Sequence, residues 1–140
     1  MSSAVLQNLI YALIQVIHNF GAAAVIGFAT YGLMRRAEWE SIQRTAFLGL
    51  LIAWAAQGIS GAVFGITSLS FYGKLPDIHG VAVVAVTIKM ICVVLGFIVA
   101  FIGFKKSKGE GRGPQGPLLI TSFVLGATAL SAAAFLRWFS

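Results

Sequence analysis

Four long apolar stretches, separated by short polar segments, account for most of the chain. They cover approximately residues 4–34, 44–69, 78–104 and 117–138. A helix needs about 20 mostly apolar residues to cross a hydrocarbon core about 30 Å thick. Each stretch reaches this length. The pattern therefore predicts an all-α integral membrane protein, a single domain of four transmembrane helices.

The basic residues predict how this bundle is oriented. Most of them fall in two of the polar segments: Arg35, Arg36 and Arg44 in the first, and Lys105, Lys106, Lys108 and Arg112 in the third. The other side of the bundle holds only Lys74 and Arg137. Short loops rich in Lys and Arg stay in the cytoplasm. We therefore expect both termini, and the segment 68–77, to face outward.

Composition agrees with a lipid environment. The chain has 140 residues, of which 59% are hydrophobic and 10% charged, and its mean hydropathy is +0.92. Soluble domains carry about 25% charged residues. The net charge of +6 could indicate nucleic-acid binding, but it is concentrated in the short loops, so nucleic acid is not an expected partner. We expect a multi-pass protein of a bacterial inner (plasma) membrane, whose partner is the lipid bilayer.

Small residues predict where the helices approach closely, because transmembrane helices pack through glycine, alanine and serine. In the second stretch the candidates are Gly58, Gly61 and Gly65, the last two spaced as Gly-x-x-x-Gly. The first stretch offers Gly21, Ala22, Ala29 and Gly32 near one stripe. A compact bundle follows from these positions.

Three polar side chains fall at one depth inside the predicted helices. His18 lies about twelve residues from the outer end of the first helix, Lys89 about eleven from the start of the third, and Gln57 about as deep in the second. Ionisable groups in hydrocarbon cost at least about 2.5–3.5 kcal/mol at the centre of a helix. Each of these side chains is therefore expected to have an interaction partner or a function.

His18 is the candidate ligand of this layer. It shares a helical stripe with Ala22, Val25 and Ala29, so it is expected to point into the bundle. A neutral imidazole can coordinate a metal or haem iron through one nitrogen while a hydrogen bond fixes the other. The alternative is a histidine that only links helices, satisfied by Gln57 or a backbone carbonyl.

The sequence leaves several interpretations of Lys89 open. It can pair with a bound anion, a carboxylate or helix carbonyls, lose its proton through desolvation, or extend along its own stem to the membrane surface. No Asp or Glu lies within the predicted helices. Proton-driven cation export, which uses buried carboxylates, is therefore disfavoured.

His79 and Met90 form a second metal hypothesis. His79 begins the predicted third helix, and Met90 lies on the same face eleven residues later, about 16 Å along the axis. They cannot hold one ion together, but they could be successive stations for copper, with Cys92 as a third, since sulfur ligands select Cu(I). Alternatively, His79 is a wet interfacial residue, and Met90 and Cys92 are packing residues.

Three segments resemble a known family. His18-Asn19-Phe20-Gly21-Ala22, Gln57-Gly58-Ile59-Ser60-Gly61 and Ile88-Lys89-Met90 look like the four-helix unit of copper resistance protein D (CopD), which itself resembles the HemJ-type protoporphyrinogen oxidases that bind haem. The resemblance implies that His18 is a haem or copper ligand and that Lys89 is its polar companion. In CopD-like chains a Tyr-Gly pair lies close before the lysine, whereas Tyr72-Gly73 stands farther away here. HemJ-like chains carry Arg-Trp-Phe-Asn before the last helix, whereas Arg137-Trp138-Phe139 ends this chain.

The leading hypothesis is a membrane bundle that binds or moves copper or b-type haem at His18, with Lys89 and Gln57 completing the site. Haem propionates would call for a basic residue such as Lys74 or Arg137 at the outer rim. One alternative is a cofactor-free structural subunit or assembly factor, whose partners are other membrane subunits or further copies of the chain. A further alternative is a HemJ-like haem-dependent oxidoreductase, although a non-enzymatic role is favoured.

Overall fold

The computed structural model describes residues 3–35, 39–74, 77–108 and 115–139. In these residues the chain forms four α-helices: α1 (Ser3–Met34), α2 (Trp39–Tyr72), α3 (Val81–Lys106) and α4 (Gly116–Phe139). Each helix is long and apolar enough to cross a membrane. The prediction of an all-α protein with four such helices is confirmed.

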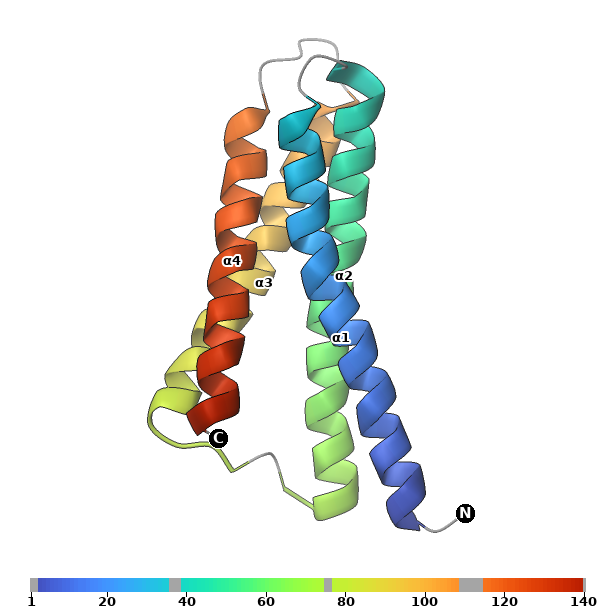
Figure 1. The fold of residues 1–140 in the computed structure, drawn as a ribbon, viewed down its shortest axis with the longest axis vertical. Helices are drawn as coiled ribbons and strands as arrows, with labels where there is room; N and C mark the ends of the chain where they lie inside the picture. The colour runs from blue at the N-terminus through green and yellow to red at the C-terminus, as the bar shows by residue number, and fades with distance from the viewer. Residues whose placement is uncertain (1–2, 36–38, 75–76, 109–114, 140) are drawn as a thin grey trace.

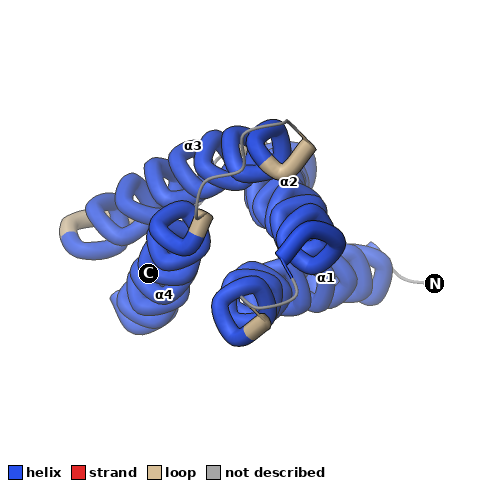
Figure 2. Tube along the Cα trace, turned by 90° about the horizontal axis from the view of Figure 1, so that it is seen from above, coloured by secondary structure: helices blue, strands red, loops and turns tan. Residues whose placement is uncertain are grey.

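The helices pack in chain order around a ring. α1 pairs with α2, α2 with α3, α3 with α4, and α4 returns to α1, so α1 and α3 lie diagonally opposite (Figure 2). Both chain ends lie at the same end of the bundle, which we call the terminal end (Figure 1). Toward it the α1–α2 hairpin diverges from the α3–α4 hairpin. The other end, where α1 is followed by α2 and α3 by α4, is the connector end, and there the helices converge.

Buried aromatic and aliphatic side chains fill the convergent half. Trp54, Phe47, Leu50 and Leu119 are each less than 2% exposed and belong to one hydrophobic cluster. Two glycines of α3 make room for the aromatic rings: a Cβ at Gly96 would collide with Trp54, and one at Gly103 with Phe47. These helices approach closely because large side chains on α2 fit against bare backbone on α3.

The boundaries of α2 differ from those predicted. It begins at Trp39 rather than near Arg44, so it includes Ser41, and it ends at Tyr72 rather than near Leu69. Polar residues can continue a helix beyond the apolar stretch because its backbone hydrogen bonds are internal. Ile42 and Gln43 are buried, which adds packing to the first turns. The end is set by Gly73, whose φ of +67° takes the chain out of the helix.

The start of α3 also differs. We expected the helix to begin near Ile78, with His79 in its first turn, but α3 begins at Val81. Gly80 has a φ of +54°, a left-handed conformation that helical residues do not adopt. His79 therefore precedes the helix, in the connection from α2. α1 and α4 begin and end within two residues of their predicted limits.

Five of the described basic residues lie in two groups at the connector end, as the pattern predicted. Arg35 follows α1, Arg44 lies early in α2, and Lys105, Lys106 and Lys108 stand at the end of α3 (Figure 1). Two of these lysines lie over phenylalanine rings of their own helix, Lys105 over Phe101 and Lys108 over Phe104. Arg36 and Arg112 lie outside the described residues.

Candidate functional site

His18 and Lys89 meet inside the bundle. The Nζ atom of Lys89 on α3 lies 2.7 Å from Nε2 of His18 on α1. This hydrogen bond crosses the diagonal of the ring of helices, and both side chains are partly buried. The two ionisable groups that the sequence places at one depth are therefore direct partners.

Ser60 on α2 holds the other side of the imidazole. Nδ1 of His18 lies 2.6 Å from the Ser60 hydroxyl, and that hydroxyl donates to the carbonyl of Ala56 at 2.5 Å. Because the only hydroxyl proton is used in that bond, the Ser60 oxygen must accept from Nδ1–H. Nε2 then carries the lone pair and accepts from Lys89. The network therefore fixes the tautomer of His18.

Gln57 acts on the backbone rather than on the ring. Its amide nitrogen donates to the carbonyl oxygen of His18, so Gln57 is brought to the site but does not contact the imidazole. Gly21 makes this approach possible, because a Cβ there would lie 2.8 Å from the Gln57 nitrogen. Gln57 and Ser60, each 5% exposed, thus fix the position and the rotation of His18 from one helix.

Lys89 has N–H donors that its hydrogen bond to His18 does not use. A lysine nitrogen has up to three N–H donors, and within the described part of the chain its hydrogen bond is the one to His18. A ligand oxygen or nitrogen entering beside the imidazole would find a free donor there. The pair can thus offer one imidazole lone pair and one N–H donor group at the same point.

His79 and Met90 lie elsewhere. His79 is exposed in the connection before α3, where its Nε2 lies 2.8 Å from Asp77. Met90 follows Lys89 on α3 but is 65% exposed, because one residue rotates the helix face by about 100°. Across residues 3–35, 39–74, 77–108 and 115–139, no three His, Cys, Asp or Glu side chains group together. Their role in a copper path stays a prediction.

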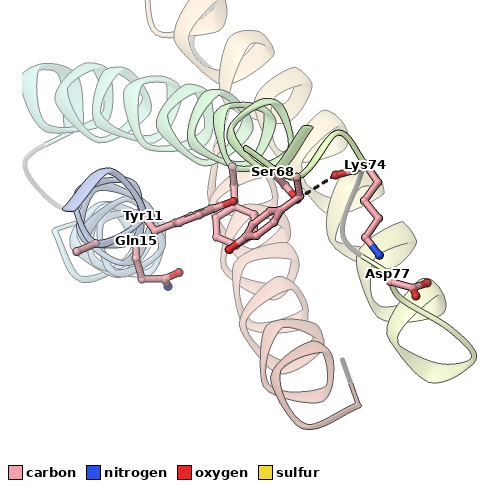
Figure 3. A pocket seen from close by; sticks show the side chains of 8 residues that line it. Tyr11, Gln15, Ser68, Lys74 and Asp77 are labelled. Carbon is pink, nitrogen blue, oxygen red and sulfur yellow. Dashed lines mark hydrogen bonds between the residues drawn. The ribbon is translucent and has the colours of Figure 1, made fainter. Parts of the chain in front are cut away.

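A cavity of about 630 Å³ opens next to this network at the terminal end. α1, α2 and the connection after α2 provide its walls (Figure 3). The lining residues are Tyr11, Ala12, Gln15, Phe64, Ser68, Tyr72, Lys74 and Asp77. Lys74, one of the two basic residues proposed for the outer rim, is among them.

Sequence reasoning missed two parts of this site. No role was predicted for Ser60, although it lies three residues after Gln57 and hence on nearly the same face of α2. The cavity was missed as well, although Tyr11 and Gln15 precede His18 by seven and three residues, a spacing that places them on its stripe. The signal in both cases was helical spacing from a residue already selected.

Comparison of the chain with protein-family models, with curated proteins and with solved structures gives no match. The resemblance to CopD-like and HemJ-like proteins therefore stands on the three segments around His18, Gln57 and Lys89 alone, and it stays a hypothesis.

Proposed function

We propose that this chain is a multi-pass protein of a bacterial inner membrane, with both termini on the outer side. The apolar faces of the four helices support this. Large hydrophobic side chains such as Phe20, Ile52 and Ile59 are 63–73% exposed, and lipid is the solvent that stabilises such a surface. The lysine- and arginine-rich connector end supports the orientation, because such loops stay in the cytoplasm.

Within this membrane protein, the proposed activity is binding of a b-type haem at His18. The observation that carries the proposal is the hydrogen bond from Nδ1–H of His18 to Ser60. It leaves Nε2 with its lone pair toward the interior, the form of histidine that ligates a metal. Nε2 is the atom that would bond the iron, and Lys89, which donates to it here, would become the neighbouring donor. Bound haem supplies reversible one-electron chemistry.

Haem suits the residues present better than copper does. A haem iron has four porphyrin nitrogens and needs one or two axial ligands from the protein, whereas a copper ion takes most of its ligands from side chains. A Lys89 ammonium beside Nε2 also repels a bare cation. By contrast, the carboxylates of a porphyrin suit Lys74, which lies on the wall of the adjacent cavity.

The test is the optical spectrum and metal content of detergent-purified protein. We expect a Soret band in the wild type that disappears in His18→Ala. His79→Ala is the matched control, because His79 is exposed and hydrogen-bonded only at the rim, and it should keep the band. A wild type with no Soret band, even after incubation with haem, would remove the haem proposal, whether or not elemental analysis finds copper.

A structural role is the second candidate, and one observation favours it. Both ring nitrogens of His18 already have partners within the chain, so the network can act as a link among α1, α2 and α3. In that case the wild type binds no prosthetic group, and His18→Ala lowers the thermal stability or the association with partner subunits. The spectrum of the wild type separates the two candidates.

A further inference from the structure

The cavity lies directly outward from the His18–Lys89 pair along two helices. Gln15 precedes His18 by three residues and Phe64 follows Ser60 by four, which correspond to about 4.5 Å and 6 Å along a helix axis. The innermost lining residues are thus one turn from the hydrogen-bonded network. His18 itself is only partly buried.

The exposed wall of the cavity is mostly apolar, with polar side chains placed along it. Lys74 and Asp77 stand at the rim, and Ser68 donates to the carbonyl of Lys74 at 3.2 Å, which holds the connection after α2 in place (Figure 3). Tyr11 and Gln15 line the cavity from α1 (Figure 3). A cavity holds water when polar partners are present, and Tyr11, Gln15 and Lys74 offer such partners here.

The connector side of the network is closed. Trp54, three residues before Gln57, is 1% exposed and fills the bundle next to Gly96. Beyond it, Phe47, Leu50 and Leu119 are fully buried. The Gln115 side chain, which is 3% exposed, is also buried at this end.

We propose that the cavity is a water-filled vestibule, through which water, protons and small hydrated solutes reach the His18–Lys89 pair from the terminal end alone. The proposal rests on insertion of the helices in a membrane and not on the identity of any cofactor. In lipid, this cavity between α1, α2 and the connection after α2 would admit water to a depth where the neighbouring helix faces contact acyl chains.

Cysteine accessibility tests the proposal directly, in the full-length protein with Cys92→Ala as the background. Gln15→Cys and Phe64→Cys place thiols on exposed parts of the cavity wall, and Ala12→Cys is a smaller change at the same wall. Leu13→Cys and Ile66→Cys are the matched controls. They lie within two residues of the test positions, and the native side chains there are 56% and 61% exposed on faces that the cavity does not include.

The reagent is a charged, membrane-impermeant methanethiosulfonate, added to sealed vesicles of known orientation. We expect the cavity positions to react at least about tenfold faster than the controls, because the reactive thiolate forms in water and not in hydrocarbon. They should react only from the side that holds the chain termini. Each variant is checked by gel filtration and thermal unfolding, and Ala12→Cys replaces Gln15→Cys if the latter misfolds.

Two results would overturn the proposal in different ways. If the cavity positions are as unreactive as Leu13→Cys, or react from the connector side, there is no vestibule, although the membrane proposal stands. If Leu13→Cys and Ile66→Cys react as fast as the cavity positions, the apolar faces are in water, and membrane insertion fails with the vestibule.

Discussion

At the scale of single residues, the site depends on how a polar group is satisfied away from water. A buried donor or acceptor without a partner costs about 1–3 kcal/mol. Here the Ser60 hydroxyl, the His18 ring and the Lys89 nitrogen form one chain of hydrogen bonds that ends on the Ala56 carbonyl. Removing any member leaves the next one unsatisfied, so the network holds His18 in a single tautomer and rotamer.

Gly21 supports this network by having no side chain. In Gly21→Ala the new Cβ would lie 2.8 Å from the Gln57 nitrogen and 3.4 Å from Ala56, so Gln57 would have to leave the His18 carbonyl. We expect a loss of about 1–3 kcal/mol in stability from overpacking, measured by thermal unfolding in detergent micelles. Any Soret band of the wild type should also shift or weaken.

Gly27→Ala is the control on the same helix. A Cβ at Gly27 meets no atom within 4 Å, so this variant should change stability by no more than about 1 kcal/mol, in the stabilising direction, because alanine favours a helix over glycine. Equal losses in the two variants would show that the substitution acts through α1 itself and not through Gln57.

At the scale of elements, glycines that receive aromatic rings connect the helices. The sequence suggested that Gly58, Gly61 and Gly65 on α2 would form the packing surface. In the structure Gly61 is exposed, and a Cβ there meets nothing within 4 Å. Gly58 does face α3, where a Cβ would lie 3.3 Å from Val93, but the closest approaches of α2 and α3 use glycines on α3, at Gly96 and Gly103. The Gly-x-x-x-Gly spacing predicts a helix face that another helix can approach closely, but it does not predict which helix packs there.

The packing of Trp54 against Gly96 gives the prediction at this scale. A Cβ in Gly96→Ala would collide with the indole ring, which is buried and has no free direction in which to move. We expect a loss of about 1–3 kcal/mol, or a shift of α3 relative to α2. Gly61→Ala on α2 should be neutral or slightly stabilising.

Thermal unfolding and cross-linking between α2 and α3 are the measurements. Gly96→Ala with the stability of the wild type would mean that Trp54 does not pack against α3. A destabilised Gly61→Ala would mean instead that a further helix, from another subunit, covers the exposed face of α2.

At the scale of the whole molecule, the two ends of the bundle differ. The connector end is tightly packed and basic, whereas the terminal end, where the hairpins diverge (Figure 1), holds the cavity. A site halfway between them is therefore connected to one side only. Because of this asymmetry, the proposed orientation in the membrane determines which compartment exchanges water and protons with His18 and Lys89.

Topology mapping tests that orientation. Affinity tags at the two termini should be accessible from outside intact spheroplasts, whereas Lys108→Cys, at the basic end, should react with an impermeant reagent only after the membrane is opened. The protein should also resist extraction by alkaline carbonate. Protected termini with a reactive Lys108→Cys would reverse the orientation, and extraction by carbonate would contradict insertion.

The sequence by itself determined the helices. An apolar run of spanning length with its polar flanks is a local property, because backbone hydrogen bonds within a helix need no partner from elsewhere in the chain. It also determined that His18, Gln57 and Lys89 share a depth, since the rise per residue is fixed. The errors at Arg44 and His79 concern helix ends, where a glycine conformation or the burial of Ile42 and Gln43 outweighs hydropathy.

Only the tertiary structure decided which groups meet. The depth of a residue does not determine how its helix is rotated or which helix is its neighbour. The sequence therefore could not predict that His18 contacts Lys89, that Ser60 bonds the imidazole, or that Gln57 bonds a backbone carbonyl. The same holds for the cavity. Its walls come from α1, α2 and the connection after α2, and how these segments sit against one another depends on packing between helices far apart in the sequence.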